Sequence, residues 1–381
     1  MKKTLAAVAV LGAFAGSAIA ADVTLYGIVD MGVGYNHVDY DGLAADEDNF
    51  SMKSGQASGS RWGLKGTEDL GNGLTVGFIL EDGFDADDGT EDSTGIKFNR
   101  ESSLFVKGSF GRFAMGRMGS MNNGQSSWAK MGMLSALGTS DWGGYSAQLG
   151  NIMSTAGQWD NMIAYETPEF AGFQVFAQYA MGSNDNENES SSDRYYGIGA
   201  TYTNGPAAAY LAVDSVNYKT FGTGINGDDI DDSLTVTLGG SWDFEVAKVY
   251  LGAQYFDEVK LSSIGGITKD LSSDALLDSA IKIKGYGISL SADAPVAGGK
   301  VMFGVGYVDA ETADSYEDVE NVSYDFTRYV VSVGYDYPFS KRTDVYAMAS
   351  YMQDSIDYNT ANVDDVDPSA CTVYVGLRHR F

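Results

Sequence analysis

Apolar and polar side chains alternate residue by residue along much of this chain, in segments that recur from residue 22 to its end. In one of them Val249, Leu251 and Ala253 alternate with Tyr250 and Gly252. A period of two is typical of a β-strand whose two faces meet different surroundings. The pattern predicts sixteen strands, over residues 22–35, 55–68, 74–81, 99–108, 112–117, 159–166, 172–180, 194–203, 206–214, 233–243, 246–257, 282–292, 299–309, 325–337, 343–354 and 371–381.

The connections between these strands fall into two classes. After even-numbered strands they are short, as at 69–73, 109–111 and 204–205, whereas after odd-numbered strands they are long and rich in Asp, Asn, Ser and Gly. This alternation places all the tight turns on one rim and all the loops on the other, as in membrane β-barrels. An even strand number also lets the last strand pair with the first and leave no free edge. We therefore expect an all-β fold, a 16-stranded antiparallel transmembrane β-barrel.

The two ends of the chain indicate where such a barrel would reside. Residues 1–20 have a positive start at Lys2 and Lys3, an apolar run and small residues before Ala21, which together predict a secretory signal peptide. The final strand ends on Phe381, and an aromatic end is a hallmark of bacterial outer-membrane barrels. No other stretch approaches the roughly 20 apolar residues of a membrane-spanning helix. We expect a barrel over 21–381 in the outer membrane of a Gram-negative bacterium.

The composition adds charge to this picture. The formal net charge is −28, and −30 without the two lysines of the signal, with the carboxylates clustered in the long connections. Such a surface attracts cations and repels nucleic acid, so no nucleic-acid partner is expected, although the charge could serve solubility alone. Cys371 is the only cysteine, which excludes an intrachain disulfide framework.

One predicted strand departs from the pattern. Lys282 and Lys284 share a face with Tyr286, Ile288 and Leu290, a face that should contact lipid. Either the strand begins above the bilayer, where lysines could meet anionic headgroups, or a β-bulge shifts the alternation. The sequence leaves both explanations open.

The connection at about 118–158 differs from every other long one. Lys130 and Asp141 are its only charged residues, and it is otherwise rich in Met, Trp and Leu. Long loops without their own core are uncommon unless they are functional. We expect this third loop to fold into the lumen and pack on the inner wall, where it would narrow the pore. An external loop or a surface adhesion lobe is the alternative.

Several stretches resemble the trimeric general porins of Gram-negative bacteria, especially those of β-proteobacteria. They are DVTLYGIVDMGV from Asp22, SRWGLKGTEDLGNGLTVGFILEDGF from Ser60, NRESSLFVKGSFGRFAMGR from Asn99 and the final VGLRHRF. The resemblance covers the chain after the signal and is weak in the loops. It implies sixteen strands, three barrels per assembly, a third loop inside each lumen and no cofactor.

The resemblance also implies which residues form the constriction, where basic groups on the wall face acidic groups. The basic candidates are Arg61, Lys65, Arg100 and Arg117. The acidic candidates are Asp141, Glu81 and Glu101. The alternation of Arg61 and Lys65 with their apolar neighbours itself predicts that they point inward, whereas the placement of Arg117 rests on the resemblance. The alternative is that these arginines only form ion pairs in a polar lumen wall.

These features predict passive diffusion of small hydrophilic solutes and ions, with a mild preference for cations. A substrate-selective channel and a surface-binding barrel are the alternatives. Catalysis is not expected, because only two histidines exist, His37 in an acidic loop and His379 on the apolar face of the final strand, so no Ser-His-Asp arrangement can be proposed. The expected partners are two further copies of the chain, outer-membrane lipid and lipopolysaccharide. Asp85, Asp87 and Asp88 could hold a divalent cation that bridges lipopolysaccharide phosphates, although their spacing does not match an EF-hand loop.

Overall fold

The computed structural model describes residues 21–93, 95–139, 144–182, 192–218, 231–268, 281–315, 323–358 and 364–381. The expected signal peptide lies outside these residues. The strands are β1 (Ala21–Asp39), β2 (Glu47–Ser54), β3 (Arg61–Gly71), β4 (Leu74–Gly83), β5 (Glu101–Gly108), β6 (Gly111–Gly119), β7 (Gln158–Glu166), β8 (Phe173–Ala180), β9 (Arg194–Asn204), β10 (Ala207–Asn217), β11 (Leu234–Asp243), β12 (Lys248–Lys260), β13 (Lys282–Val296), β14 (Gly299–Thr312), β15 (Tyr324–Pro338), β16 (Thr343–Tyr358) and β17 (Ser369–Arg380). The short 3₁₀ helices are η1 (Met131–Leu134), η2 (Leu149–Asn151) and η4 (Leu261–Ser263).

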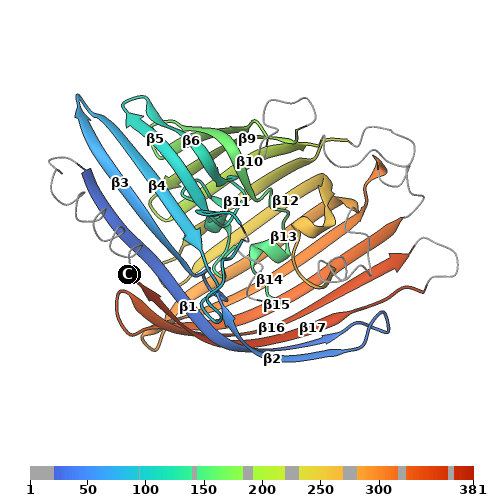
Figure 1. Cartoon of the computed structure of the whole chain (residues 1–381). Helices are drawn as coiled ribbons and strands as arrows, with labels where there is room; N and C mark the ends of the chain where they lie inside the picture. The colour runs from blue at the N-terminus through green and yellow to red at the C-terminus, as the bar shows by residue number, and fades with distance from the viewer. Residues whose placement is uncertain are drawn as a thin grey trace.

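The strands form one antiparallel sheet that closes on itself (Figure 1). One edge of β1 pairs with β17, in a register that runs from Ile28 opposite Arg380 to Asp39 opposite Ser369. The other edge pairs with β2 along the second half of β1 and with β3 along its first half. Because β2 and β3 together fill one position beside β1, the seventeen strands make sixteen barrel positions. The predicted 16-stranded barrel is confirmed. No helix among the described residues is long and apolar enough to cross a membrane.

The second predicted strand, 55–68, differs most from the structure, since the chain leaves the sheet at residues 55–60 and an additional strand, β2, precedes this break. The buried carboxylate of Asp30 accepts hydrogen bonds from the backbone amides of Ala57 (3.2 Å) and Ser58 (2.7 Å). The Ser60 hydroxyl donates to the backbone oxygen of Asp30 at 3.1 Å. An inward carboxylate on β1 thus holds the interruption between β2 and β3.

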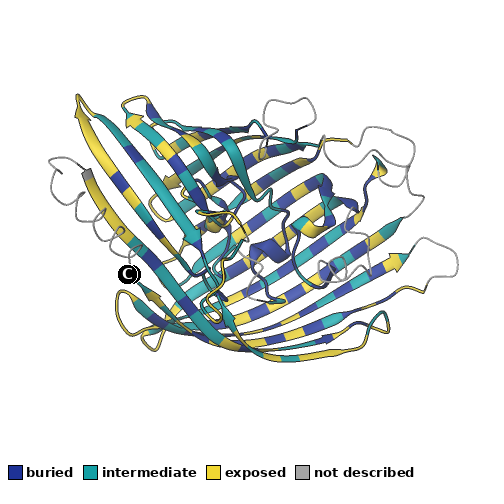
Figure 2. Cartoon of the chain, in the orientation of Figure 1, coloured by how far each residue is buried: buried dark blue, intermediate teal, exposed yellow. Residues whose placement is uncertain are grey.

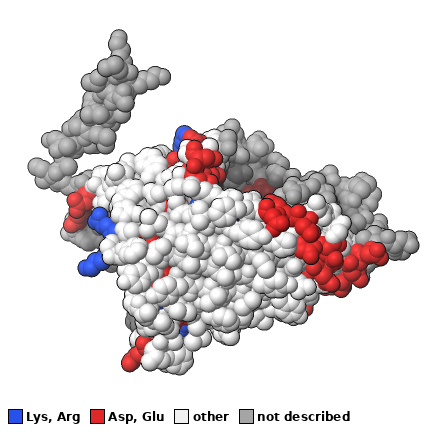
Figure 3. Space-filling model, turned by 90° about the horizontal axis from the view of Figure 1, so that it is seen from below, with Lys and Arg blue, Asp and Glu red and all other residues white. Residues whose placement is uncertain are grey.

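The two faces of the wall have the alternating exposure that the sequence predicts. On β17, Val373, Val375 and Leu377 point outward and are about half exposed, whereas Thr372 and Tyr374 are buried inside. Figure 2 shows the same alternation as stripes along most strands. From below, much of the surface is uncharged, with the carboxylates gathered in patches (Figure 3). This outer surface suits hydrocarbon.

Aromatic rings gather at both ends of the outward face. Near the loop end, the ring centres of Tyr286 and Tyr307 lie 6.1 Å apart, and those of Tyr307 and Tyr329 lie 5.0 Å apart. Near the turn end, Trp242 contacts Phe244 at 6.4 Å. Two aromatic belts separated by an apolar band are typical of a membrane barrel, because these rings favour the headgroup region.

A β-bulge on β12 lies opposite the lysines that break the alternation in β13. The register between β12 and β13 shifts between Phe256 and Val259. Lys282 is fully buried and lies 3.5 Å from the Glu258 carboxylate. Lys284 is partly exposed and forms ion pairs with Glu311 (3.2 Å) and Asp314 (2.5 Å). Of the two explanations that the sequence left open, the bulge is present, and both lysines have protein carboxylates as partners.

The wall is not equally tall all round. Strands β5 to β8 have 8, 9, 9 and 8 residues, whereas β13 to β16 have 15, 14, 15 and 16. A strand rises about 3.4 Å per residue, so the tall side extends well beyond an apolar band of about 25 Å. The loop rim is therefore low over β5–β8 and high over β13–β16.

The seam between β1 and β17 depends on a small residue. Gly27 exchanges backbone hydrogen bonds with Phe381 at 3.2 and 3.0 Å. A Cβ at Gly27 would lie 2.6 Å from the carbonyl oxygen of Arg61 and press against the Phe381 ring. We expect Gly27→Val to lower the unfolding free energy by about 1–3 kcal/mol, as overpacking commonly does. The thermal unfolding midpoint measures this. The exposed Ala209→Val is the control, and equal midpoints for the two variants would contradict the expectation.

Candidate pore constriction

The segment between β6 and β7 lies against the inner wall around a large part of the barrel. Its backbone amides donate to wall side chains on five strands. The pairs are Met121 to Gln178 (2.9 Å, β8), Ser154 to Gln254 (2.7 Å, β12), Ala136 to Ser291 (3.0 Å, β13), Ala147 to Ser332 (2.8 Å, β15) and Tyr145 to Thr372 (3.3 Å, β17). We call residues 120–139 and 144–157 the inner loop. Figure 1 shows this segment within the outline of the barrel.

The apolar side chains of the inner loop fit where the wall has glycines. Leu134, Ile152 and Met153 are fully buried. A Cβ added at Gly252 of β12 would lie 2.9 Å from the Met153 methyl group and 3.2 Å from the Leu134 Cβ. Other wall glycines in contact with the inner loop are Gly239, Gly287, Gly304 and Gly306. Small wall residues therefore let the loop lie close to the barrel.

Trp128 anchors the first part of the inner loop. Its side chain is only 1% exposed and packs in a cluster with Met118, Met162 and Tyr195. The guanidinium of Arg112 lies 4.0 Å from the Trp128 ring centre, a cation–π distance. Nearby, burial lowers the pKa of the Lys130 ammonium, which lies over the Phe176 ring.

A cavity of about 270 Å³ remains on the opposite side, against β1, β3, β4 and β5. On the loop side it is lined by small uncharged residues, Gly124, Ser126 and Ser127. On the wall side it is lined by Tyr26, Ile79 and five charged residues: Arg61, Lys65, Glu81, Arg100 and Glu101. The inner loop thus covers the β8–β17 side of the lumen, and hydrophilic space stays open along β1–β5.

The candidate residue Glu81 lies among the basic residues on the same wall. Its carboxylate accepts from Nε of Arg100 at 2.7 Å, lies 3.7 Å from Nε of Arg61, and accepts the Tyr26 hydroxyl at 3.0 Å. Lys65 is exposed to the cavity, with its ammonium 4.9 Å from the Tyr26 ring centre. Glu81 therefore reduces the positive field of the basic wall from within that wall. It does not face the basic residues from the other side of the lumen.

Glu101 and Arg100 connect the wall to the edge of the inner loop. Glu101 accepts from the backbone amide (2.8 Å) and the hydroxyl (3.0 Å) of Ser127. Arg100 donates to the side-chain oxygen of Gln125 at 2.7 Å, and that oxygen also accepts from Gln158 at 2.7 Å. Two of the candidate residues thus hold the loop edge that borders the cavity.

Of the two remaining constriction candidates, Arg117 lies away from this cavity. Arg117 donates from Nη1 to Asp160 at 2.5 Å and from Nε to the Asn99 carbonyl at 2.8 Å, and it does not line the cavity. Asp141 lies outside the described residues. The described edge of the loop that faces the basic wall carries no carboxylate.

The three aspartates proposed for a divalent cation lie in the loop after β4. Burial, together with repulsion from Asp92, Asp87 and Asp88, raises the pKa of the Asp85 carboxyl. Asp88 accepts from the amide (2.8 Å) and hydroxyl (2.7 Å) of Thr90, and these bonds lower the pKa of Asp88. Within the described ranges, no group of three or more His, Cys, Asp or Glu side chains is arranged to hold a metal ion.

One site residue, Arg328 of β15, was not predicted from the sequence. Arg328 is fully buried and forms a bidentate ion pair with the equally buried Asp354 of β16, at 2.6 and 2.7 Å. It also donates to the inner loop, at the backbone oxygen of Asn151 (2.8 Å). The available signal was an arginine on the inward face of β15, between the apolar residues Phe326 and Val330 of the same face. Nothing in the sequence indicated its partners, which come from three different parts of the chain.

The chain and its barrel resemble known proteins. Residues 6–357 match the family model described as Gram-negative porin. An outer membrane porin protein of Bordetella pertussis is 34% identical, and outer membrane porin protein 32 of Delftia acidovorans is 30% identical, each over all of both chains. A solved structure described as an anion-selective porin from Comamonas acidovorans superposes with a TM-score of 0.67 at 28% identity, and covers 95% of this chain and 100% of its own.

Proposed function

Because this chain belongs to the Gram-negative porin family, we propose that it is a general diffusion porin whose passage runs between the inner loop and β1–β5. The observation that carries this proposal is the 270 Å³ cavity lined by Arg61, Lys65, Arg100, Glu81 and Glu101. Charged and hydroxyl side chains replace part of the hydration of a polar solute, whereas apolar solutes gain nothing there. Transport through such an opening is passive and needs neither cofactor nor catalysis.

The ion preference of this passage follows from how its charges are distributed. Arg61 and Arg100 share Glu81, and Glu101 adds a second carboxylate, so one net positive charge remains on the five residues. The outer connections carry most of the excess negative charge of the chain. We infer a mild preference for cations, which the acidic outer connections produce and the net positive charge of the cavity lining opposes. The Comamonas structure is described as anion-selective, so the sign of the preference is what needs to be measured.

A recording in a planar bilayer tests both parts of the proposal. Under a KCl gradient at low ionic strength, we expect a reversal potential that favours K⁺. The preference should fall in 1 M salt, where the Debye length shrinks from about 10 Å at 0.1 M to about 3 Å. A reversal potential that favours Cl⁻ at low salt would contradict the cation preference alone. Absence of any conductance from folded protein would contradict the porin function.

A substrate-selective channel remains the second candidate, and the aromatic residues bear on it. Of the aromatic side chains that point inward, Tyr26 lines the cavity, whereas Phe176 and Tyr346 are almost fully buried. A continuous aromatic track for a sugar would need exposed rings along the passage. The arrangement therefore favours general diffusion, and saturation of conductance by one solute would favour the alternative.

The partners are part of the same proposal. The low wall of β5–β8 exposes outward apolar residues, such as Leu104 and Met115, on a side where the barrel is short. We propose that two further copies cover this side in a homotrimer, and that lipid and lipopolysaccharide cover the rest. Conductance that rises in steps of three equal units would support the trimer. Asp85, Asp87 and Asp88 stay candidates for a divalent cation that bridges lipopolysaccharide phosphates.

A further inference from the structure

The outer segment that follows β12 forms hydrogen bonds directly with the inner loop. The amide of Gly265 donates to the Gly150 oxygen at 2.7 Å, and the amide of Thr155 donates to the Ser263 oxygen at 3.2 Å. The hydroxyls of Ser154 and Ser263 lie 2.7 Å apart. Residues 261–268 thus connect the loop rim of the barrel to the segment that narrows the lumen.

Arg328 joins these two segments to the wall. Besides its ion pair with Asp354, it donates from Nη1 to the backbone oxygens of Asn151 (2.8 Å) and Gly265 (2.5 Å). Its Nη2 also donates to the Thr268 hydroxyl at 2.9 Å. We call these five residues the Arg328 clasp. A lysine could not replace the arginine here, because the planar guanidinium serves both carboxylate oxygens and three further acceptors at once.

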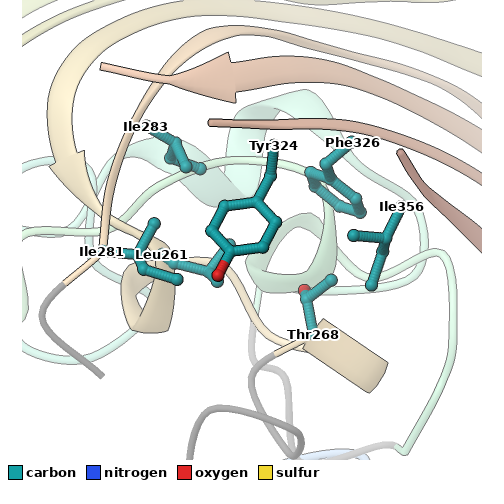
Figure 4. A pocket seen from close by; sticks show the side chains of 7 residues that line it. All are labelled: Leu261, Thr268, Ile281, Ile283, Tyr324, Phe326 and Ile356. Atoms are coloured by element: carbon teal, nitrogen blue, oxygen red, sulfur yellow. The ribbon is translucent and has the colours of Figure 1, made fainter. Parts of the chain in front are cut away.

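The surroundings of the clasp are largely apolar. Figure 4 shows a small cavity that Thr268 of the clasp helps to line, and its volume is about 20 Å³. Its lining is Leu261, Thr268, Ile281, Ile283, Tyr324, Phe326 and Ile356. The Arg328 guanidinium also lies 5.1 Å from the centre of the Phe326 ring. Charged hydrogen bonds are strong in such a medium, and a partner left alone there is strongly disfavoured.

We propose that Arg328 is a positioning residue that holds the inner loop against the tall wall and so keeps the passage along β1–β5 open. This inference rests on the proposed porin function. Without the clasp, residues 144–155 lose their main charged tie to β15 and β16. The loop would then move toward the passage and interrupt the current.

Single-channel recording of Arg328→Met, which keeps an unbranched apolar stem but removes the guanidinium and every donor, tests the clasp. We expect brief closures to become at least about ten-fold more frequent, because removing one partner of a buried ion pair is strongly destabilising. Thr268→Val removes one acceptor and should fold even if Arg328→Met does not, with a smaller increase in closures. Arg328→Lys should not restore the wild-type closure rate.

Two controls separate the clasp from a general loss of stability. Arg378 is also an inward arginine paired with wall carboxylates, Asp336 (3.1 Å) and Asp344 (2.9 Å), so Arg378→Met should leave the closure rate unchanged. A disulfide between Gly150→Cys and Gly265→Cys, made in a Cys371→Ala background, should suppress the closures of Arg328→Met when oxidised. Wild-type closure rates in both Arg328→Met and Thr268→Val would overturn the clasp while leaving porin function intact. A wild type without conductance would overturn the porin function itself.

Discussion

Replacing residues 121–156 by a two-residue turn is expected to raise single-channel conductance by about two-fold or more, because pore width governs passage. The structure allows this change, since the amide of Ser120 donates to the Gly157 oxygen at 3.0 Å. The ends of the inner loop are thus already close enough for a short connection. The lumen without the loop would be a wide polar tube whose wall carries serine, threonine and glutamine side chains.

Two measurements test this expectation. Conductance in 1 M KCl gives the change in open area, and swelling of liposomes in sugars of increasing size gives the exclusion limit. The folded barrel should persist, because all the wall pairings remain, and β-sheet circular dichroism checks this. Unchanged conductance and an unchanged exclusion limit in a folded variant would show that the inner loop does not narrow the passage.

The second large effect is expected from Glu81→Gln. Glu81 is the carboxylate shared by Arg61 and Arg100, so its neutralisation leaves two arginines and Lys65 at the cavity, opposed only by Glu101. A unit charge about 8 Å from an ion in water changes its energy by about 0.5 kcal/mol, with opposite signs for K⁺ and Cl⁻. The difference of about 1 kcal/mol changes the ratio of K⁺ to Cl⁻ permeability by about five-fold. We expect the reversal potential to shift toward Cl⁻.

The matched control is Asp336→Asn, which removes a wall carboxylate that is also paired with an arginine, Arg378, but does not line the cavity. Its reversal potential should stay close to that of the wild type at the same KCl gradient. Equal shifts in the two variants would mean that the net charge of the whole protein, and not the charge of the cavity lining, sets the selectivity. A shift of Glu81→Gln toward K⁺ would contradict the expected direction.

The barrel itself could be predicted from the sequence because its cause is local and periodic. Val373, Val375 and Leu377 differ from Thr372 and Tyr374 by which side of the wall they face, and a period of two records that directly. The break at 55–60 could not be predicted in this way. It depends on the Asp30 carboxylate of another strand, which binds the amides of Ala57 and Ser58.

The site was harder to predict, because its geometry comes from contacts between distant parts of the chain. Periodicity placed Arg61 and Lys65 on the inner face, and both line the cavity. It could not show that Glu81 lies between arginines of the same wall, since this depends on the register of β3, β4 and β5. The Arg328 clasp is the extreme case, because its five residues lie on two strands and two loops.

The glycines of the wall carry a wider consequence. Gly252 has no side chain on the inner face of the wall, and Met153 and Leu134 of the inner loop occupy that space. The inner loop therefore lies closer to the wall than a larger residue would allow. A bulkier residue at this position would displace the loop toward the opposite wall and narrow the pore without any change in the loop sequence. Related channels could therefore differ in pore diameter through residues of the barrel strands alone. A comparison of loop sequences would not reveal this difference.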